Sequence, residues 1–411
     1  MIPPHTPSSS TACYSVLVTA KLDTEAIIRQ FGQAFDIHQC ADLTEAGMNS
    51  RMYTLITGGV PVGVATVDTS TVESSLTTRI SFISIERGKQ AGLKFPPEIT
   101  RLSDLIDKVN AGDVAAQVEL GDAYFVGVFG KADAALAVDN WRMAADQESP
   151  IGYQRLALAY YSGRGIERNI EVASDLFEKS AAGGDSEGQA MMGWIYSKGD
   201  GRPRDAVKAV DWLQRAVAQG HAGAANNLAT MYAKGDGVPR DQSRALTLYR
   251  ESAAKGCGLS LVNLGLCHAQ GRGVEVNKAE AAKCFQSAAD IGETEGEHNL
   301  GVLYEDGDGV VRDLAKAADL FERAAKKGHA GAQNNLGLIL ARGTGRPQDL
   351  IEGAKWWIIA SASGNSDAIA NMPEMKRYLT QKDLQEAQRR AAEFKPELAT
   401  DAAPLSGAPR K

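Results

Sequence analysis

Residues 227–256 read NLATMYAKGDGVPRDQSRALTLYRESAAKG, and residues 299–328 return to the pattern as NLGVLYEDGDGVVRDLAKAADLFERAAKKG. Outward from these two copies, one 36-residue module runs seven times from Asp113 to Gly364 without an insertion or deletion. The clearest marker of the module is a Gly at a fixed place: Gly127, Gly163, Gly199, Gly235, Gly271, Gly307 and Gly343. A fixed period of roughly 20 to 50 residues is typical of a solenoid of stacked repeats.

Each copy predicts two antiparallel helices. In the third copy Met192 and Tyr196 are four residues apart, so they share one face of the first helix. The second helix places a small residue four positions before a bulky one, as Ala209 before Leu213. Small residues facing large ones allow two helices to interdigitate. Gly193, beside Met192, costs a helix ~1 kcal/mol relative to Ala, and we therefore expect a neighbouring helix backbone to approach closely there.

The turns and caps of the module also repeat. A second Gly follows the marker Gly two residues later in six copies, whereas the first copy has Phe129. Glycine suits such a loop because it adopts positive φ without strain. An Asp or Asn stands where the N-cap of the second helix belongs: Asp133, Asn169, Asp205, Asp241, Asn277, Asp313 and Asp349. A further Gly ends that helix: Gly184, Gly220, Gly256, Gly292, Gly328 and Gly364.

The order Asn-Leu-Gly, Tyr, Gly-x-Gly-Val and Ala-Ala-x-x-Gly resembles the Sel-one-like repeat (SLR), a relative of the tetratricopeptide repeat with a longer loop between its helices. The resemblance spans residues 113–364. It implies an all-α, right-handed superhelical solenoid of seven helix-turn-helix repeats. It also implies scaffold or adaptor work through protein contacts, and bacterial members suggest a signalling, host-contact or toxin-immunity role.

Both flanks of the repeats are predicted to differ from them. We expect residues 1–13 to be disordered, residues 14–88 to form a small α+β domain of open role, and residues 97–112 to form a connecting helix. The expected strands are Tyr14–Ala20, Ile37–Leu43, Met52–Thr57, Val62–Val67 and Arg79–Ile85, with a helix near Thr24–Phe35 and a hairpin turn at Gly58-Gly59.

A capping segment is predicted after the last repeat, over residues 365–396, with a flexible tail at 397–411. An eighth copy begins there, but Pro373 replaces its small residue and should end or kink the helix. Thr380 and Asp383 form a capping-box pattern for a final helix that stops before Pro396. Solenoids need such a cap with a polar outer face.

Composition limits the classes of partner. The formal net charge of −7 argues against nucleic acid or an anionic membrane as the main partner. No apolar run approaches the ~18 residues of a membrane span, and no secretory signal is evident at the start. The five Cys are odd in number and follow no repeat phase, unlike the regular Cys that staple secreted relatives of the resembled family. We therefore expect a cytoplasmic protein.

Several strings imitate reactive sites. Residues 184–188 match G-x-S-x-G, but that motif needs a strand-to-helix turn, whereas here it falls between two helices. The loops at 199–201 and 306–309 resemble calcium loops without the remaining ligands. His221 and His329 lie three repeats apart and are interpreted as junction residues. Cys267 and Cys284 could lie close on paired helices, where lone buried thiols are the usual outcome. We expect no catalytic residue, metal or cofactor.

The open face of the first helices follows from a rotation of 100° per residue away from the packed Leu and Tyr positions. In a superhelix of this kind that face lines the concave groove. The predicted groove residues are Glu187, Trp194, Lys198, Asn226, Thr230, Lys234, His298, Asp306, Asn334 and Arg342. Trp194 is prominent because Trp is frequent in interface hot spots, and packing between first helices is the alternative. The Asn at 227, 263, 299 and 335 fits either a structural or a ligand-binding role.

The sequence thus predicts a non-catalytic scaffold that binds a protein or extended peptide in its groove. We expect no nucleic-acid partner, no membrane insertion, and a monomer or weak oligomer. The alternative hypothesis is an enzyme whose N-terminal domain carries the chemistry while the solenoid presents the substrate.

Overall fold

The computed structural model describes residues 15–19, 36–45, 48–57, 60–72, 75–83, 97–128, 132–375 and 377–397. These residues belong to two compact units, Met1–Leu176 and Phe177–Lys411, each considered by itself below. The expected helix at 24–35, the turn at Gly58-Gly59 and the segments 1–13 and 398–411 lie outside the described residues.

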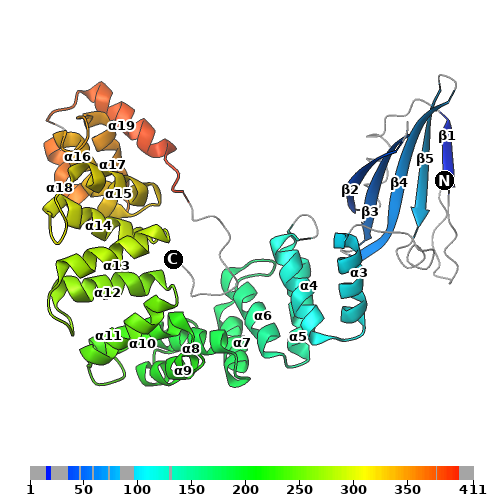
Figure 1. Cartoon of the computed structure of the whole chain (residues 1–411), viewed down its shortest axis with the longest axis horizontal. Coiled ribbons are helices and arrows are strands. Elements are labelled where there is room, and N and C mark those ends of the chain that lie inside the picture. The colour runs from blue at the N-terminus through cyan, green and yellow to red at the C-terminus, as the bar shows by residue number, and fades with distance from the viewer. Residues whose placement is uncertain are drawn as a thin grey trace. The chain divides into compact units, whose positions relative to one another are not determined.

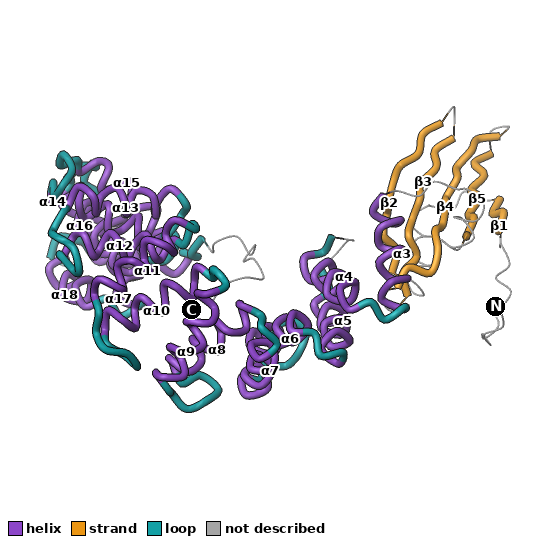
Figure 2. The backbone as a smooth tube through the Cα atoms, turned by 60° about the horizontal axis from the view of Figure 1, so that its bottom comes forward, coloured by secondary structure: helices purple, strands orange, loops and turns teal. Residues whose placement is uncertain are grey.

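The first unit contains an antiparallel sheet of five strands in the order β1-β5-β4-β3-β2 (Figures 1 and 2). The strands are β1 Ser15–Thr19, β2 Asp36–Glu45, β3 Met48–Thr57, β4 Val60–Val72 and β5 Ser75–Ile83. The strands from β2 to β5 pair with their sequence neighbours, and β1 pairs with β5 at the edge. The middle strands extend past the predicted apolar runs because Thr, which is abundant there, favours strands as Val does.

The other described elements of the first unit are helices. They are α3 Pro97–Asn110, α4 Val114–Val126, α5 Ala134–Asp146 and α6 Pro150–Ser162, with α7 Ile170–Ala182 crossing into the second unit. Leu105 and Val109 of α3 pack with Ala116 and Leu120 of α4 in one buried cluster. The helix that precedes the repeats therefore docks on the first repeat and covers its apolar face.

The second unit is built of helical hairpins (Figure 1). The first helices of its repeats are α8 Ser186–Lys198, α10 Ala222–Lys234, α12 Gly258–Gln270, α14 Thr294–Asp306 and α16 Ala330–Arg342. The second helices are α9 Ala206–Ala218, α11 Gln242–Ala254, α13 Lys278–Asp290, α15 Leu314–Lys326 and α17 Leu350–Ala362. The seven-repeat helical solenoid predicted from the spacing is confirmed.

Packing inside a hairpin explains the helical Gly. A Cβ built on Gly193 would lie 2.5 Å from Cγ of Leu213, and one on Gly265 would lie 2.5 Å from the Phe285 ring. The bulky residue of the second helix therefore lies over the Gly of the first. The predicted close backbone approach is secondary, because the nearest backbone atom to the Gly193 Cβ is the Ala209 oxygen at 3.2 Å.

The loop between the helices packs against the preceding repeat. The marker Gly is the C-cap of the first helix in the left-handed conformation, as at Gly271 with φ of 70°. The second Gly, for example Gly273 with φ of +74°, leaves room for the previous second helix, since a Cβ there would lie 2.7 Å from the Gln242 carbonyl oxygen. One glycine thus ends the helix and the other permits the next repeat to stack.

The C-terminal end is closed by α18 Ser366–Met375, which contains Pro373, and α19 Gln381–Glu393. The capping box of Thr380 and Asp383 forms as predicted. Phe394 follows α19 and packs edge-on against Trp356 at 5.2 Å between ring centroids. No helix in the described part of the chain is long and apolar enough to cross a membrane.

Candidate functional site

First helices of successive repeats lie against one another, α8 against α10 and α12 against α14. Side-chain amides connect first helices at two further junctions, α10 with α12 and α16 with α18. Asn226 of α10 accepts hydrogen bonds through Oδ1 from the Ser260 hydroxyl at 3.0 Å and from Asn263 Nδ2 at 2.9 Å. Asn371 of α18 donates in the same way to Oδ1 of Asn334 at 3.0 Å. These amides hold neighbouring repeats in register.

Two predicted groove residues are therefore buried. Asn226 is 6% exposed and Asn334 is 4% exposed. Each first helix is covered by its own second helix and by both neighbouring repeats, so its open face is narrower than a projection from one packed stripe suggests. Asn226 and Asn334 lie on the side that meets the next repeat, and their side chains are not available to a partner in this structure.

Six predicted residues do share an accessible face. Lys198, Lys234, Asp306 and Arg342 are exposed at the ends of their helices, while Trp194 and Thr230 are half-buried one turn earlier. Within the five repeats of the second unit, the remaining residues at these two positions are half-buried Leu266, Val302 and Leu338 and exposed Gln270. We call these ten residues the first-helix face: Trp194, Lys198, Thr230, Lys234, Leu266, Gln270, Val302, Asp306, Leu338 and Arg342.

Glu187, a predicted groove residue, lies instead at a repeat junction. Its Oε2 is 2.9 Å from Nε2 of His221. The Nδ1 of His221 accepts from the backbone N–H of Ala224 at 3.0 Å and so caps α10. Because Nδ1 is an acceptor, the ring hydrogen is on Nε2 and is donated to the carboxylate. The prediction that His221 is a junction residue is confirmed by this arrangement.

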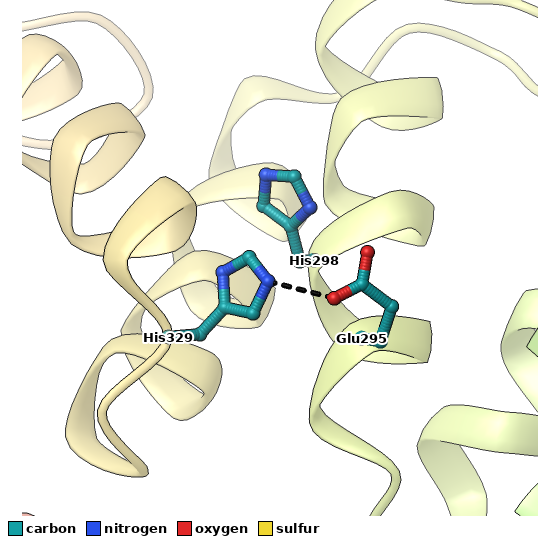
Figure 3. A group of neighbouring side chains, drawn as sticks. All are labelled: Glu295, His298 and His329. Atoms are coloured by element: carbon teal, nitrogen blue, oxygen red, sulfur yellow. Dashed lines mark hydrogen bonds and ion pairs between the residues drawn. The ribbon is translucent and has the colours of Figure 1, made fainter. Parts of the chain in front are cut away.

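The same junction recurs three repeats later with one addition (Figure 3). His329 caps α16 through the Ala332 N–H at 3.0 Å, and its Nε2 lies 2.9 Å from Oε2 of Glu295. The addition is His298, on the same helix as Glu295, whose ring stacks on His329 with centroids 4.4 Å apart. Ligating atoms of Glu295, His298 and His329 all lie within 4.8 Å of one another. At the earlier junction, Ala190 stands in the place of His298.

The environment of this cluster keeps His298 neutral. Burial, with the neighbouring His329 adding to it, lowers the pKa of His298 to about 4. The hydrogen bond from His329 holds the pKa of Glu295 below its usual value. Nδ1 of His298 is buried and has no hydrogen-bond partner among the described residues. Three potential metal ligands, one with a nitrogen not otherwise engaged, therefore meet at one repeat junction.

A sequence signal for the cluster exists but is weak. Glu295 and His298 are three residues apart on one helix, so they share a face. His329 precedes the first helix of the following repeat and is 34 residues from Glu295 in the sequence. Only the stacking of the two repeats brings them together. His221 and His329 stand at the same repeat position, and the two junctions differ in sequence by Ala190 at one and His298 at the other.

The G-x-S-x-G string and the pair Cys267 and Cys284 lie in helical packing. Asp185, inside the G-x-S-x-G string, caps α8 by accepting from the Gly188 N–H. Cys267 and Cys284 are buried free thiols. Burial raises the pKa of Cys284 to about 11, so this thiol is protonated at physiological pH and is a poor nucleophile.

The family model described as Sel1 repeat matches seven consecutive stretches, 114–149, 150–185, 186–221, 222–257, 258–293, 294–329 and 330–365. The chain belongs to the Sel1 repeat family. These matches divide the Sel1 repeats at the same 36-residue step as the marker glycines and the helix pairs.

Solved structures agree with the Sel1 assignment. A protective antigen of uropathogenic Escherichia coli, described as displaying an SLR fold, is 29% identical with a TM-score of 0.57, over 71% of this chain and 64% of that chain. A Sel1 repeat protein from Oxalobacter formigenes is 32% identical with a TM-score of 0.55, over 66% of this chain and 79% of that chain. None of the curated proteins compared with the chain matches it.

Proposed function

We propose that this Sel1 repeat protein is a non-catalytic scaffold that binds a protein or an extended peptide on its first-helix face. The supporting observation is the contrast between two sets of repeat positions. Some packing positions hardly change between copies, such as the position of Leu228, which is always Leu or Met, and the marker Gly, which never changes. The exposed last position of the first helix changes from Lys198 and Lys234 to Gln270, Asp306 and Arg342. The stacking of repeats does not require any particular charge at these exposed positions. A bound partner does favour particular charges there.

The chemistry of the first-helix face suits a protein ligand. Its half-buried floor is formed largely by Trp194, Leu266, Val302 and Leu338. Charged and polar side chains at the helix ends border that floor. Interfaces between proteins combine an apolar centre with a polar rim, and Trp is frequent among their energetically important residues. We infer that the partner offers apolar side chains to the floor and acidic groups to Lys198 and Lys234.

The relative from uropathogenic Escherichia coli is described as a protective antigen. That description supports a host-contact role for the scaffold in a bacterium, and the signalling and toxin-immunity roles stay hypotheses. Support for a scaffold comes from the family and from the variable face together.

The test begins with the full-length tagged protein purified from its own cells, with identification of chains that co-purify in stoichiometric amounts. Binding of the identified chain is then measured to the wild type and to the double variant Lys198→Glu/Lys234→Glu. Reversal of these two charges is expected to weaken binding at least tenfold. The loss of affinity should be larger at low salt, because salt screens exposed charges.

Lys283→Glu is the matched control, because Lys283 is an exposed lysine on the second helix α13. It should bind like the wild type. Equal binding by the wild type and the Lys198/Lys234 variant would refute the assignment of the face. Turnover of a small molecule by the purified chain, without any retained partner, would favour the enzyme hypothesis instead.

A further inference from the structure

We propose that Glu295, His298 and His329 bind a divalent transition-metal ion of the zinc type at the junction between α14 and α16. One carboxylate and two imidazoles are a donor set that zinc accepts, with a water molecule completing four-coordination. Their ligating atoms already lie within 4.8 Å of one another. With bonds of about 2.0–2.2 Å to zinc, ligand atoms in a tetrahedral site are roughly 3.3 Å apart, so these atoms need to approach one another by about 1.5 Å at most.

Two of the ligands lie in a helix and the third is a helix cap. Glu295 and His298 lie in the first turns of α14, one turn apart on the same face. His329 is the N-cap of α16 and is placed by the turn that follows α15. The ring of His298 also lies 5.8 Å from the ring of Phe321, which is fully buried, so His298 is backed by the core of its own repeat. The ligands thus approach from two stacked repeats.

Metal binding has a defined consequence for the hydrogens. Without metal, His329 carries its hydrogen on Nε2 and donates it to Glu295, while Nδ1 accepts from the Ala332 N–H. A metal bound at Nε2 takes the lone pair of that nitrogen, so the ring hydrogen moves to Nδ1 and the cap bond from Ala332 is lost. Two hydrogen bonds are therefore lost, from the Ala332 N–H to His329 and from His329 to Glu295. Bonds from the metal to His329 Nε2 and to the Glu295 carboxylate replace them.

The chain contains its own comparison. Glu187 and His221 reproduce the Glu295–His329 pair, with the same 2.9 Å contact and the same helix cap. That junction lacks a third ligand because Ala190 occupies the place of His298. A carboxylate–histidine pair is therefore sufficient for the repeat junction, and His298 is the residue that turns one junction into a metal site. Its buried Nδ1 has no other hydrogen-bond partner among the described residues.

The experiment uses the full-length protein, expressed without a polyhistidine tag and freed of metal by a chelator. Zn²⁺ binding is followed by calorimetry, and Co²⁺ binding by its visible absorption. The wild type should bind one ion at this site with micromolar or tighter affinity and show the absorption of low-coordinate Co²⁺. His298→Ala should weaken that binding at least 100-fold. Glu295→Gln, which keeps an acceptor for His329 but removes the charge, should weaken it at least tenfold.

His221→Ala is the matched control and should retain wild-type metal binding, with circular dichroism showing that every variant is folded. The proposal is overturned if the wild type binds neither Zn²⁺ nor Co²⁺ at micromolar concentration. It is equally overturned if folded His298→Ala binds like the wild type, or if His221→Ala loses as much affinity as His298→Ala. Zinc and cobalt are probes of the same donor chemistry, and an ion retained on purification would identify the native metal.

Discussion

Glu297 has a side chain that is 0% exposed, and two cations approach it. Arg323 Nη2 lies 2.6 Å from its Oε1, and Lys327 Nζ lies 2.9 Å from the same atom. Lys327 also donates to the carbonyl oxygen of Gly292 at 3.1 Å. The buried carboxylate therefore depends on long side chains that reach in from α15 and its C-cap.

Replacement of Lys327 by Ala is expected to destabilise the protein. Removing one partner of a buried ion pair typically costs about 3–5 kcal/mol because a buried charge is left uncompensated. Arg323 remains beside Glu297, so we expect a smaller loss of about 2–3 kcal/mol. For a cooperative unit of 150–250 residues this corresponds to a fall in Tm of roughly 5–10 °C.

Two other repeats have an uncharged pair at the positions of Glu297 and Lys327. Gln117 Oε1 accepts from Gln147 Nε2 at 2.9 Å, and Gln189 Oε1 accepts from Gln219 Nε2 at 2.9 Å, at the positions equivalent to 297 and 327. The double variant Glu297→Gln/Lys327→Gln copies this neutral pair. It should lose less than about 1 kcal/mol relative to the wild type, since a buried ion pair exchanged for matched polar groups is often close to neutral.

The assay is urea unfolding followed by circular dichroism, with thermal unfolding as a second measure. Lys327→Ala should be the least stable of the set, and the double glutamine variant should lie near the wild type. The reasoning is wrong if Lys327→Ala leaves both transitions in place. It is also wrong if the double glutamine variant is no more stable than Lys327→Ala.

Trp194→Ala, on the first-helix face, should weaken partner binding about 30-fold. Trp212, on the second helix α9, is half-buried like Trp194, and its ring centroid lies 4.6 Å from Cζ of Arg215, so Trp212→Ala should lower Tm to a similar extent but spare binding. Gly193→Ala would bring a Cβ within 2.5 Å of the opposing leucine, and calorimetric unfolding should show a loss of about 1–3 kcal/mol. Burial raises the pKa of Cys284 to about 11, so Cys284 should be alkylated far more slowly than Cys257 at pH 8. The alkylation rate of Cys284 should rise steeply as the pH approaches 11. Peptide mass spectrometry after timed alkylation measures both rates, and equal labelling of the two cysteines at pH 8 would contradict this prediction.

The hairpins were predictable because their determinants are local. The pairing of Ala209 with Leu213, the left-handed Gly at the helix end and the N-cap Asp205 all act within one 36-residue copy. Seven copies in phase repeat the same evidence, so the helical solenoid followed from the sequence alone. The capping box of Thr380 and Asp383 belongs to the same class, since both residues lie in one turn of helix.

The faces of the first helices were decided by tertiary structure. Asn226 and Thr230 lie one turn apart and project to similar angles, yet Asn226 is buried by the next repeat whereas Thr230 is half-buried on the accessible face. Helical periodicity gives an angle around one helix. It does not give how far along that helix a neighbouring repeat extends, because that depends on the angle at which repeats stack.

The metal-ligand cluster shows the same division most clearly. The sequence determined that Glu295 and His298 share a helix face and that His329 begins the next repeat. Only the stacking of α14 on α16 brought His329 within 2.9 Å of Glu295 and laid its ring on His298. Each repeat buries its apolar surface mainly against its neighbours, so contacts between repeats are set by how two folded surfaces fit, which no pattern inside a single copy encodes.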